Sequence, residues 1–142
     1  MSTYKMGFEG LLYYGTAGST AATLLENCRD ITIDLSVNRG NTTVRGDSTS
    51  PPIHTEDVTE MMSGLEFTML NDTADTAFQA LQDAAGAGTA IALRGLDHAS
   101  GKGPDADFTV SISKPLTLEG EQVVTVTAVP TRGSGRAPQR WV

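Results

Sequence analysis

Residues 30–37 read D-I-T-I-D-L-S-V, a strict alternation of polar and apolar side chains over eight positions. Successive side chains of a β-strand point to opposite faces, so this period of two predicts a strand with one buried and one exposed face. This strand is expected to span 23–37, with a bend near 26–27, and the further strands are expected at 5–14, 61–70, 90–96, 107–113 and 121–129. The run at 90–96 is mostly apolar and is expected to be covered on both faces. The chain is therefore predicted to be mainly β, as a β-sandwich or partial barrel.

One helix is expected within this β pattern, at about residues 73–85. Asp72 is a favourable N-cap, and Asp75 would lie in the first turn, where the helix dipole favours an acid. Gly86 and Gly88 would end the helix. Its apolar residues form one narrow stripe at helical spacing: Ala74, Ala77, Phe78, Leu81 and Ala84 or Ala85. Such a stripe predicts ordinary core packing of the helix across one face of a sheet.

A long polar arm separates two of the expected strands. Residues 38–57 show no apolar periodicity, and Pro51–Pro52 favours extended backbone, although residues 42–45 could pair within the arm. Loops of this length in a compact domain are usually functional or disordered. The arm is therefore predicted to bind something. One interpretation is a ligand loop on a monomeric or small-oligomer β-sandwich binding module.

Composition narrows the class of protein. The 142 residues suit one domain, yet 39% apolar residues with one Trp, three Tyr and four Phe suggest that neighbouring subunits complete the burial. The single cysteine, Cys28, excludes an internal disulfide. No run is long enough to span a membrane and the N-terminus lacks a signal-peptide layout, so we expect synthesis in the cytosol. A net charge of −7 argues against a conventional nucleic-acid binder.

The polar faces of the expected strands carry acids and hydroxyls but no lysine or arginine. A solvated face of an ordinary protein mixes both signs of charge, and β-propensity explains the threonines without explaining the missing cations. Two interpretations stay open, an ordinary exposed face and a surface that avoids binding a polyanion. The residues concerned are Asp30, Thr32, Asp34, Ser36, Glu66, Thr68, Thr109, Ser111, Thr125 and Thr127.

Signals of catalysis are weak. The chain has two histidines and one cysteine, and no spacing of a zinc site. The segment G-L-D-H-A-S-G-K-G at 95–103 differs from a phosphate loop, because five residues separate Gly95 from the Gly101–Lys102 pair and Gly103 replaces the metal-binding Ser or Thr. It is better explained as a turn between strands. We expect no enzyme, no metal and no cofactor.

Several segments, taken in order, resemble the tail tube (major tail) proteins of tailed bacteriophages. They are G-T-A-G-S-T-A-A-T-L-L-E-N-C-R-D-I-T-I-D-L at 15–35, T-T-V-R-G-D at 42–47 and L-E-F-T-M-L-N-D-T-A-D-T-A-F-Q-A-L-Q-D-A at 65–84. Three later segments, at 90–97, 105–113 and 123–131, are similar too, so the resemblance covers roughly residues 7–131. It implies a single tail-tube domain over 1–142, with 132–142 as a C-terminal extension. It also implies a non-enzymatic β-sandwich with one flanking helix.

The resemblance further implies hexameric rings that stack into a hollow tube. The partners would be copies of the chain itself, other tail proteins at the tube ends, and double-stranded DNA that passes through the lumen without specific binding; no membrane is involved. The location would be the phage tail of a virion, after synthesis in the host bacterial cytoplasm. The sequence leaves open a gene-transfer particle or an injection device, and it favours a flexible over a sheathed tail.

These expectations assign roles to individual residues. The lumen-lining set is Asp30, Thr32, Asp34, Glu66, Thr68, Thr109, Ser111, Thr125 and Thr127. The arm would contact the next ring through Arg39, Thr43, Arg45, Asp47 and His54. The tail at 132–142 would dock on an adjacent subunit through Arg136 and Trp141, because Arg and Trp are enriched at interfaces.

Overall fold

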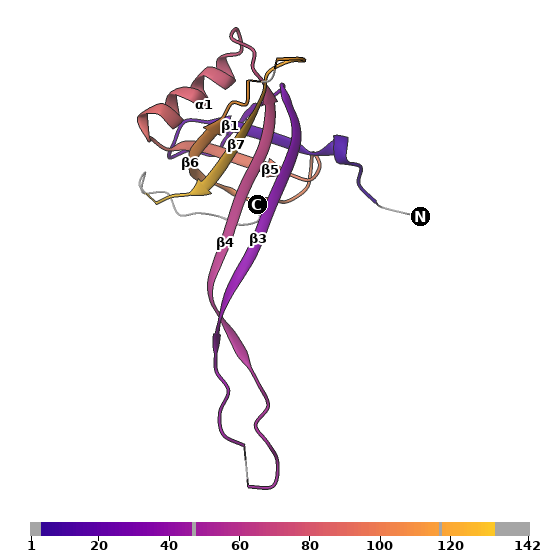
Figure 1. Cartoon of the computed structure of the whole chain (residues 1–142), viewed down its shortest axis with the longest axis vertical. Helices are drawn as coiled ribbons and strands as arrows, with labels where there is room; N and C mark the ends of the chain where they lie inside the picture. Colours follow the sequence, from indigo (N-terminus) through magenta and orange to yellow (C-terminus); the bar gives the residue numbers. More distant parts are fainter. Residues whose placement is uncertain (1–3, 47, 117, 133–142) are drawn as a thin grey trace.

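The computed structural model describes residues 4–46, 48–116 and 118–132, and it shows one curled antiparallel sheet with one helix (Figure 1). The strand order is β2-β1-β5-β6-β7-β4-β3. The strands are β1 (Leu11–Gly15), β2 (Thr23–Leu24), β3 (Cys28–Asn41), β4 (Glu56–Leu70), β5 (Ile91–Leu96), β6 (Asp105–Ser113) and β7 (Val123–Pro130). The helix is α1 (Thr76–Ala87), and a short 3-10 turn, η1 (Gly7–Glu9), precedes β1. The predicted mainly β fold with one helix is confirmed, in its partial-barrel form.

The sheet curls into a half-barrel, and the hydrophobic core lies on its concave side. β3 and β4 run along one wall, β1 and β5 cross behind them, and α1 packs beside β6 (Figure 1). The apolar residues of the alternating strands face this core, as predicted, except Leu35, which is 43% exposed, and Val37, which lies outside the core cluster. β5 is buried on both faces except at the half-buried Arg94. The largest fully buried apolar side chains are Phe67, Phe78, Phe108, Leu12, Leu65, Met69, Leu81, Leu93, Val124 and Val126.

The helix begins at Thr76, three residues later than about 73. Asp75 is the N-cap, and its carboxylate accepts a hydrogen bond from the Ala77 amide at 3.1 Å. Asp72, the expected cap, instead accepts from the Ala74 amide at 2.9 Å in the turn before the helix. At the other end, Gly88 has a φ of 70° and closes the helix in the left-handed conformation. The helix therefore includes Gly86, which was expected to help end it.

The bounds of every expected strand differ from those in the structure, and two of the differences change the arrangement of the strands. The first strand starts at Leu11 rather than residue 5, because residues 7–9 form η1. The long strand expected at 23–37 is two separate strands, and the bend expected near 26–27 is the break between them. β2 pairs with β1 and β3 pairs with β4, so the two lie at opposite edges of the sheet. The expectation of one continuous strand was wrong because alternation along a chain does not show which neighbour supplies the hydrogen bonds.

The arm is more regular than predicted. β3 continues to Asn41 and β4 begins at Glu56, so both ends of the 38–57 segment belong to a two-stranded hairpin that projects from the body (Figure 1). A register shift, the mark of a β-bulge, lies between Asn38 and Arg39. Beyond the strands, the amide of Thr42 still donates to the carbonyl of Thr55 at 3.0 Å, as the expected pairing near 42–45 requires.

The described residues contain no helix that is both long and apolar enough to cross a membrane.

Candidate functional site

The expected lumen residues lie on one face of one sheet. β6, β7, β4 and β3 are successive neighbours in the sheet, and residues directly opposite in antiparallel strands share a face. The pairings Ser111 with Thr127, Thr127 with Glu66, and Glu66 with Thr32 form a continuous row across four strands. A second row joins Ser113, Thr125 and Thr68. The backbone amide of Asp30 extends this row, because it donates to the Thr68 hydroxyl at 3.0 Å.

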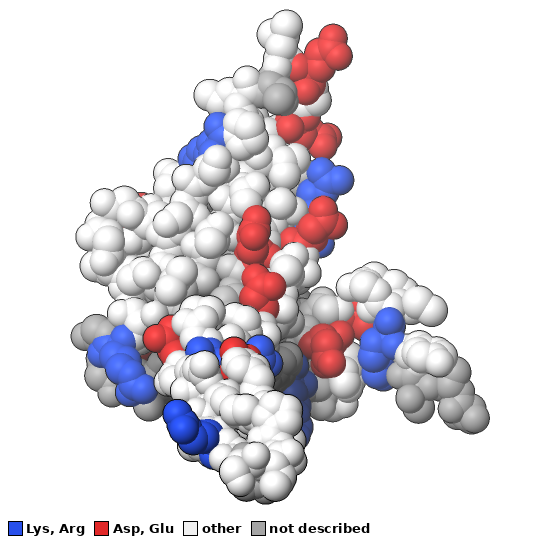
Figure 2. Space-filling model, turned by 60° about the horizontal axis from the view of Figure 1, so that its bottom comes forward, with Lys and Arg blue, Asp and Glu red and all other residues white. Residues whose placement is uncertain are grey.

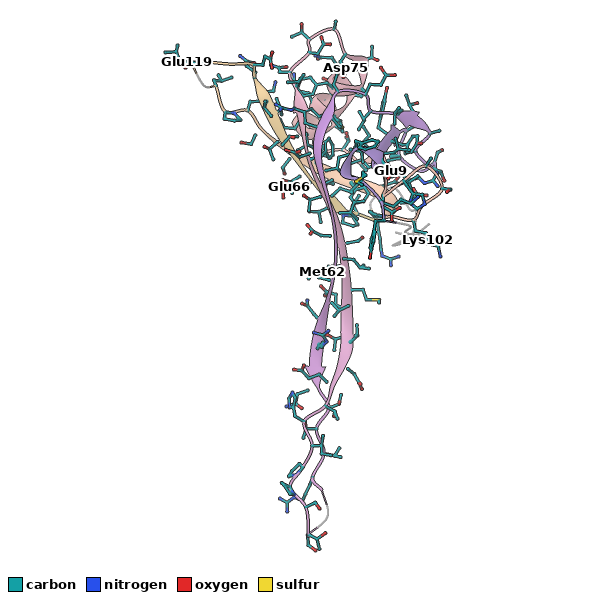
Figure 3. All side chains as sticks on the ribbon, turned by 90° about the vertical axis from the view of Figure 1, so that its right-hand side faces the viewer. Glu9, Met62, Glu66, Asp75, Lys102 and Glu119 are labelled. Carbon is teal, nitrogen blue, oxygen red and sulfur yellow. The ribbon has the colours of Figure 1, made fainter. Side chains whose placement is uncertain are left out.

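This polar face is directed away from the core. Figure 3 shows Glu66 on the side of the sheet opposite to Glu9 and the rest of the body. Every residue of the expected lumen set is exposed or half-buried. Within the described part of the chain, no ion pair involves Asp30, Asp34 or Glu66. Acidic side chains occur along the visible surface in Figure 2. The face therefore presents uncompensated carboxylates among hydroxyl groups.

The sequence missed several residues of this face. Ser113 pairs with Thr125, and Val129 pairs with Thr109. Met62 pairs with Ser36 at the end nearest the arm. Val129 lies in phase with Thr125 and Thr127, so the alternation along β7 already contained this signal. Met62 and Val129 are exposed apolar residues on an otherwise polar face.

In the arm, the structure brings together two of the expected contact residues. The Thr43 hydroxyl lies 3.2 Å from His54 Nδ1 and accepts from the Thr55 amide at 2.9 Å. His54 Nε2 lies 3.4 Å from Glu56 Oε1. Thr43 and His54 thus hold the two sides of the hairpin together.

The other expected contact residues of the arm are not joined to this pair. Arg39 is exposed and pairs in register with Val58 in the strand part, and Arg45 is exposed nearer the tip. Val44 and Ile53, which the sequence analysis did not single out, add exposed apolar surface near the tip. Asp47, Arg136 and Trp141 lie outside the described residues.

Within the 95–103 segment, Gly95 and Leu96 end β5, and the rest lies in the connection to β6, as expected for a turn between strands. A Cβ atom at Gly103 would lie only 1.6 Å from the Gly95 carbonyl oxygen, so glycine is needed there for packing. His98 Nδ1 contacts Asp97 Oδ1 at 2.7 Å within the same turn. Among the described residues, no cluster of three or more His, Cys, Asp or Glu could hold a metal ion.

Two buried features were not anticipated. Asp105 and Asp107 are almost fully buried, and Asp107 Oδ2 accepts from the Gly18 amide at 2.9 Å, which fastens the turn between β1 and β2. Burial and, to a smaller extent, the negative charge of Asp75 together raise the pKa of the Cys28 thiol from 9.0 to about 12. Both features belong to the packing of the fold.

Comparisons with known proteins agree with this architecture. The chain is similar to a subunit in the tail of an empty gene transfer agent (GTA) particle solved with C6 symmetry, with a TM-score of 0.73 and 13% identity over 96% of this chain and 98% of that one. It is also similar to a chain of the native GTA virion, with a TM-score of 0.70 and 11% identity over 96% and 98%. The SPP1 tail tube gives a TM-score of 0.68 and 11% identity over 89% and 75%. No family model and no curated protein sequence matches. The chain therefore has the fold of tail tube subunits.

Proposed function

We propose that the protein is a structural, non-enzymatic subunit of a tail tube, which assembles into hexameric rings that stack into a conduit for DNA ejection. The observation that carries this proposal is the continuous polar face of β6, β7, β4 and β3, which contains acids and hydroxyls on the side away from the core. A conduit for a polyanion needs a polar wall without cations, because strong cation–phosphate contacts would hold the duplex in place. The lumen-lining set assigned from the sequence would form this wall.

Ring closure is supported by the edges of the sheet. β3 is a 14-residue strand at one edge of the sheet, and an exposed edge of that length is an aggregation hazard in a monomer. A neighbour in a closed ring would cover it. The C6 symmetry of the GTA tail supports six subunits in the ring.

Stacking is assigned to the arm. It projects beyond the body and makes its described hydrogen bonds within its own hairpin, so its exposed Arg39, Arg45, Val44 and Ile53 are placed to contact a subunit of the next ring. The Arg-bearing segment 132–142 would dock on an adjacent subunit, with Trp141 as its anchor.

Electron microscopy of the purified protein in negative stain tests the proposal. We expect rings and long hollow tubes with six subunits in each ring. Compact particles that never polymerise over a wide range of protein and salt concentration would refute it and would favour the monomeric binding module.

A further inference from the structure

The polar face has an apolar exception at its arm end. Met62 and Val129 are 42% and 58% exposed, and they line an open hollow of about 530 Å³ together with Pro130. Gly64, which has no side chain, and Arg132 also line the hollow. Exposed apolar residues that gather in a hollow commonly mark an interaction site. A lumen surface that only contacts water and DNA does not require exposed apolar side chains.

Three charged residues line this hollow. Two of them are acids, Asp34 and Glu60, and Glu60 Oε1 accepts a hydrogen bond from the Asn38 side chain at 3.2 Å. Arg132 is the one cation among the described lining residues. An occupant with an apolar tip and a neighbouring carboxylate would therefore fit best if it entered with its acid next to Arg132.

A segment with these properties lies at the other end of the polar face. In the β6–β7 loop at 114–122, Leu116 is 72% exposed and Leu118 is fully exposed, and Glu119 follows directly. Figure 3 shows Glu119 on the same side of the sheet as Glu66, at the end away from the arm and Met62. Two exposed leucines in one short loop have no packing role within the described fold.

Both ends of this loop are held by the body. The Lys114 ammonium donates to Gln82 Oε1 of α1 and lies 5.3 Å from the centre of the Phe78 ring. At the other end, the Asn71 amide donates to the Gln122 carbonyl at 3.0 Å. A loop fixed at both ends presents its leucines at lower entropic cost than a free tail would.

We propose that Leu116 and Leu118 of one copy dock into the Met62–Val129 hollow of a second copy, with Glu119 beside Arg132. The inference rests on the proposed tube and identifies one contact within it. The two leucines and the hollow lie at opposite ends of one face, so the contact is head-to-tail. Each pair of copies therefore keeps one leucine pair and one hollow free for the next copy. Such a contact does not close on itself and propagates along an axis.

The two surfaces are too far apart to meet within one molecule. Met62 and Leu70 lie on the same strand, eight residues apart, and the loop lies beyond the Leu70 end, where Leu70 pairs with Val123. Eight residues of strand span about 26 Å, whereas a disulfide needs Cα atoms within roughly 7 Å. A disulfide between cysteines at positions 62 and 118 can therefore form only between copies.

The test is oxidative cross-linking of the full chain with the double substitution Met62→Cys and Leu118→Cys. Assembled protein should give a ladder of dimers, trimers and longer species on non-reducing gels. The wild type, with only the half-buried Cys28, should give none, and either single variant should stop at dimers. The matched control pairs Leu118→Cys with Leu24→Cys, which is another exposed apolar residue but lies on the opposite sheet edge.

A second variant covers the case in which the cysteines disturb the contact. Leu116→Ser with Leu118→Ser should leave the monomer's circular dichroism unchanged and raise the protein concentration needed for assembly at least about tenfold. Wild-type tubes with no ladder from the 62–118 pair, or with an equal ladder from the control pair, would overturn this contact and leave the tube standing. A wild type that forms no tubes at all would overturn the proposed function and this inference together.

Discussion

Replacing Glu66 with lysine tests the proposed lumen most directly. Glu66 is exposed between Thr127 and Thr32 in the four-strand row, and it makes no ion pair in the described chain. An exposed side chain of this kind should change the free energy of unfolding by less than about 0.5 kcal/mol when it is replaced. In a hexameric ring, however, the substitution would turn about six negative charges into about six positive ones facing the DNA.

The expected effect on DNA follows from counterion release. Lysines from one ring could contact up to about six phosphates, and each contact contributes a slope of about −0.9 to the dependence of log K on log salt. The affinity for duplex should then fall roughly 10³-fold between 50 and 200 mM salt. Tubes of Glu66→Lys should hold duplex at low salt and release it at high salt, whereas wild-type tubes should hold little at either.

The assay is co-sedimentation of tubes with a short fluorescent duplex, followed by nuclease digestion. Only duplex inside the tube is protected, so the protected fraction reports lumenal binding. Glu66→Gln removes the charge without adding a cation, and Asp83→Lys makes the same charge change on the exposed surface of α1. If Glu66→Lys tubes protect no more duplex than Asp83→Lys tubes, Glu66 does not face the lumen and the electrostatic reasoning fails.

Three further predictions concern the arm, the tail and Cys28. Amides of the outer arm, residues 42–55, should exchange rapidly in the monomer, because the strand pairing of β3 with β4 ends at Asn41 and Glu56, and at least about tenfold more slowly in tubes; equal exchange in both states would remove the arm from stacking. Deleting 132–142 should weaken tube formation in sedimentation assays while the monomer's melting temperature stays constant, because the deleted segment lies beyond β7; normal polymerisation would show that the tail is idle. Burial and the nearby Asp75 charge raise the pKa of Cys28 from 9.0 to about 12, so the folded chain keeps the thiol protonated at pH values where the unfolded chain loses the proton. This contribution to stability is complete below pH 9 and is lost as the pH rises toward 12. Urea titrations should show a steeper loss of stability over that window for the wild type than for Cys28→Ser, and an identical slope would contradict the assignment.

The elements of this chain that could be predicted are those fixed by short-range geometry. Alternation placed Ile31 and Ile33 opposite Thr32 and Asp34, because backbone pleating alone sends neighbouring side chains to opposite faces. Helical spacing likewise placed Phe78 and Leu81 in the core, where both are fully buried. These features depend on positions a few residues apart, so the sequence carries them directly.

Pairing over long distances was decided by the tertiary structure. That Thr32, Glu66, Thr127 and Ser111 form one row depends on β4 lying between β3 and β7, an order that alternation cannot show because any buried strand alternates in the same way. The break between β2 and β3 has the same origin, since each strand follows a different hydrogen-bonding partner.

The N-cap of the helix is another feature that the sequence narrowed to two residues and the tertiary structure decided. Asp72 and Asp75 are equally good caps by residue type, but the side-chain amide of Asn27 donates to Asp75 Oδ2 at 2.8 Å and ties this carboxylate to the turn before β3. The sequence by itself determined which residues could line a face, cap the helix or form the arm. The tertiary structure decided which of them meet, because hydrogen bonds between strands and the burial of a shared core join residues that are far apart in the chain.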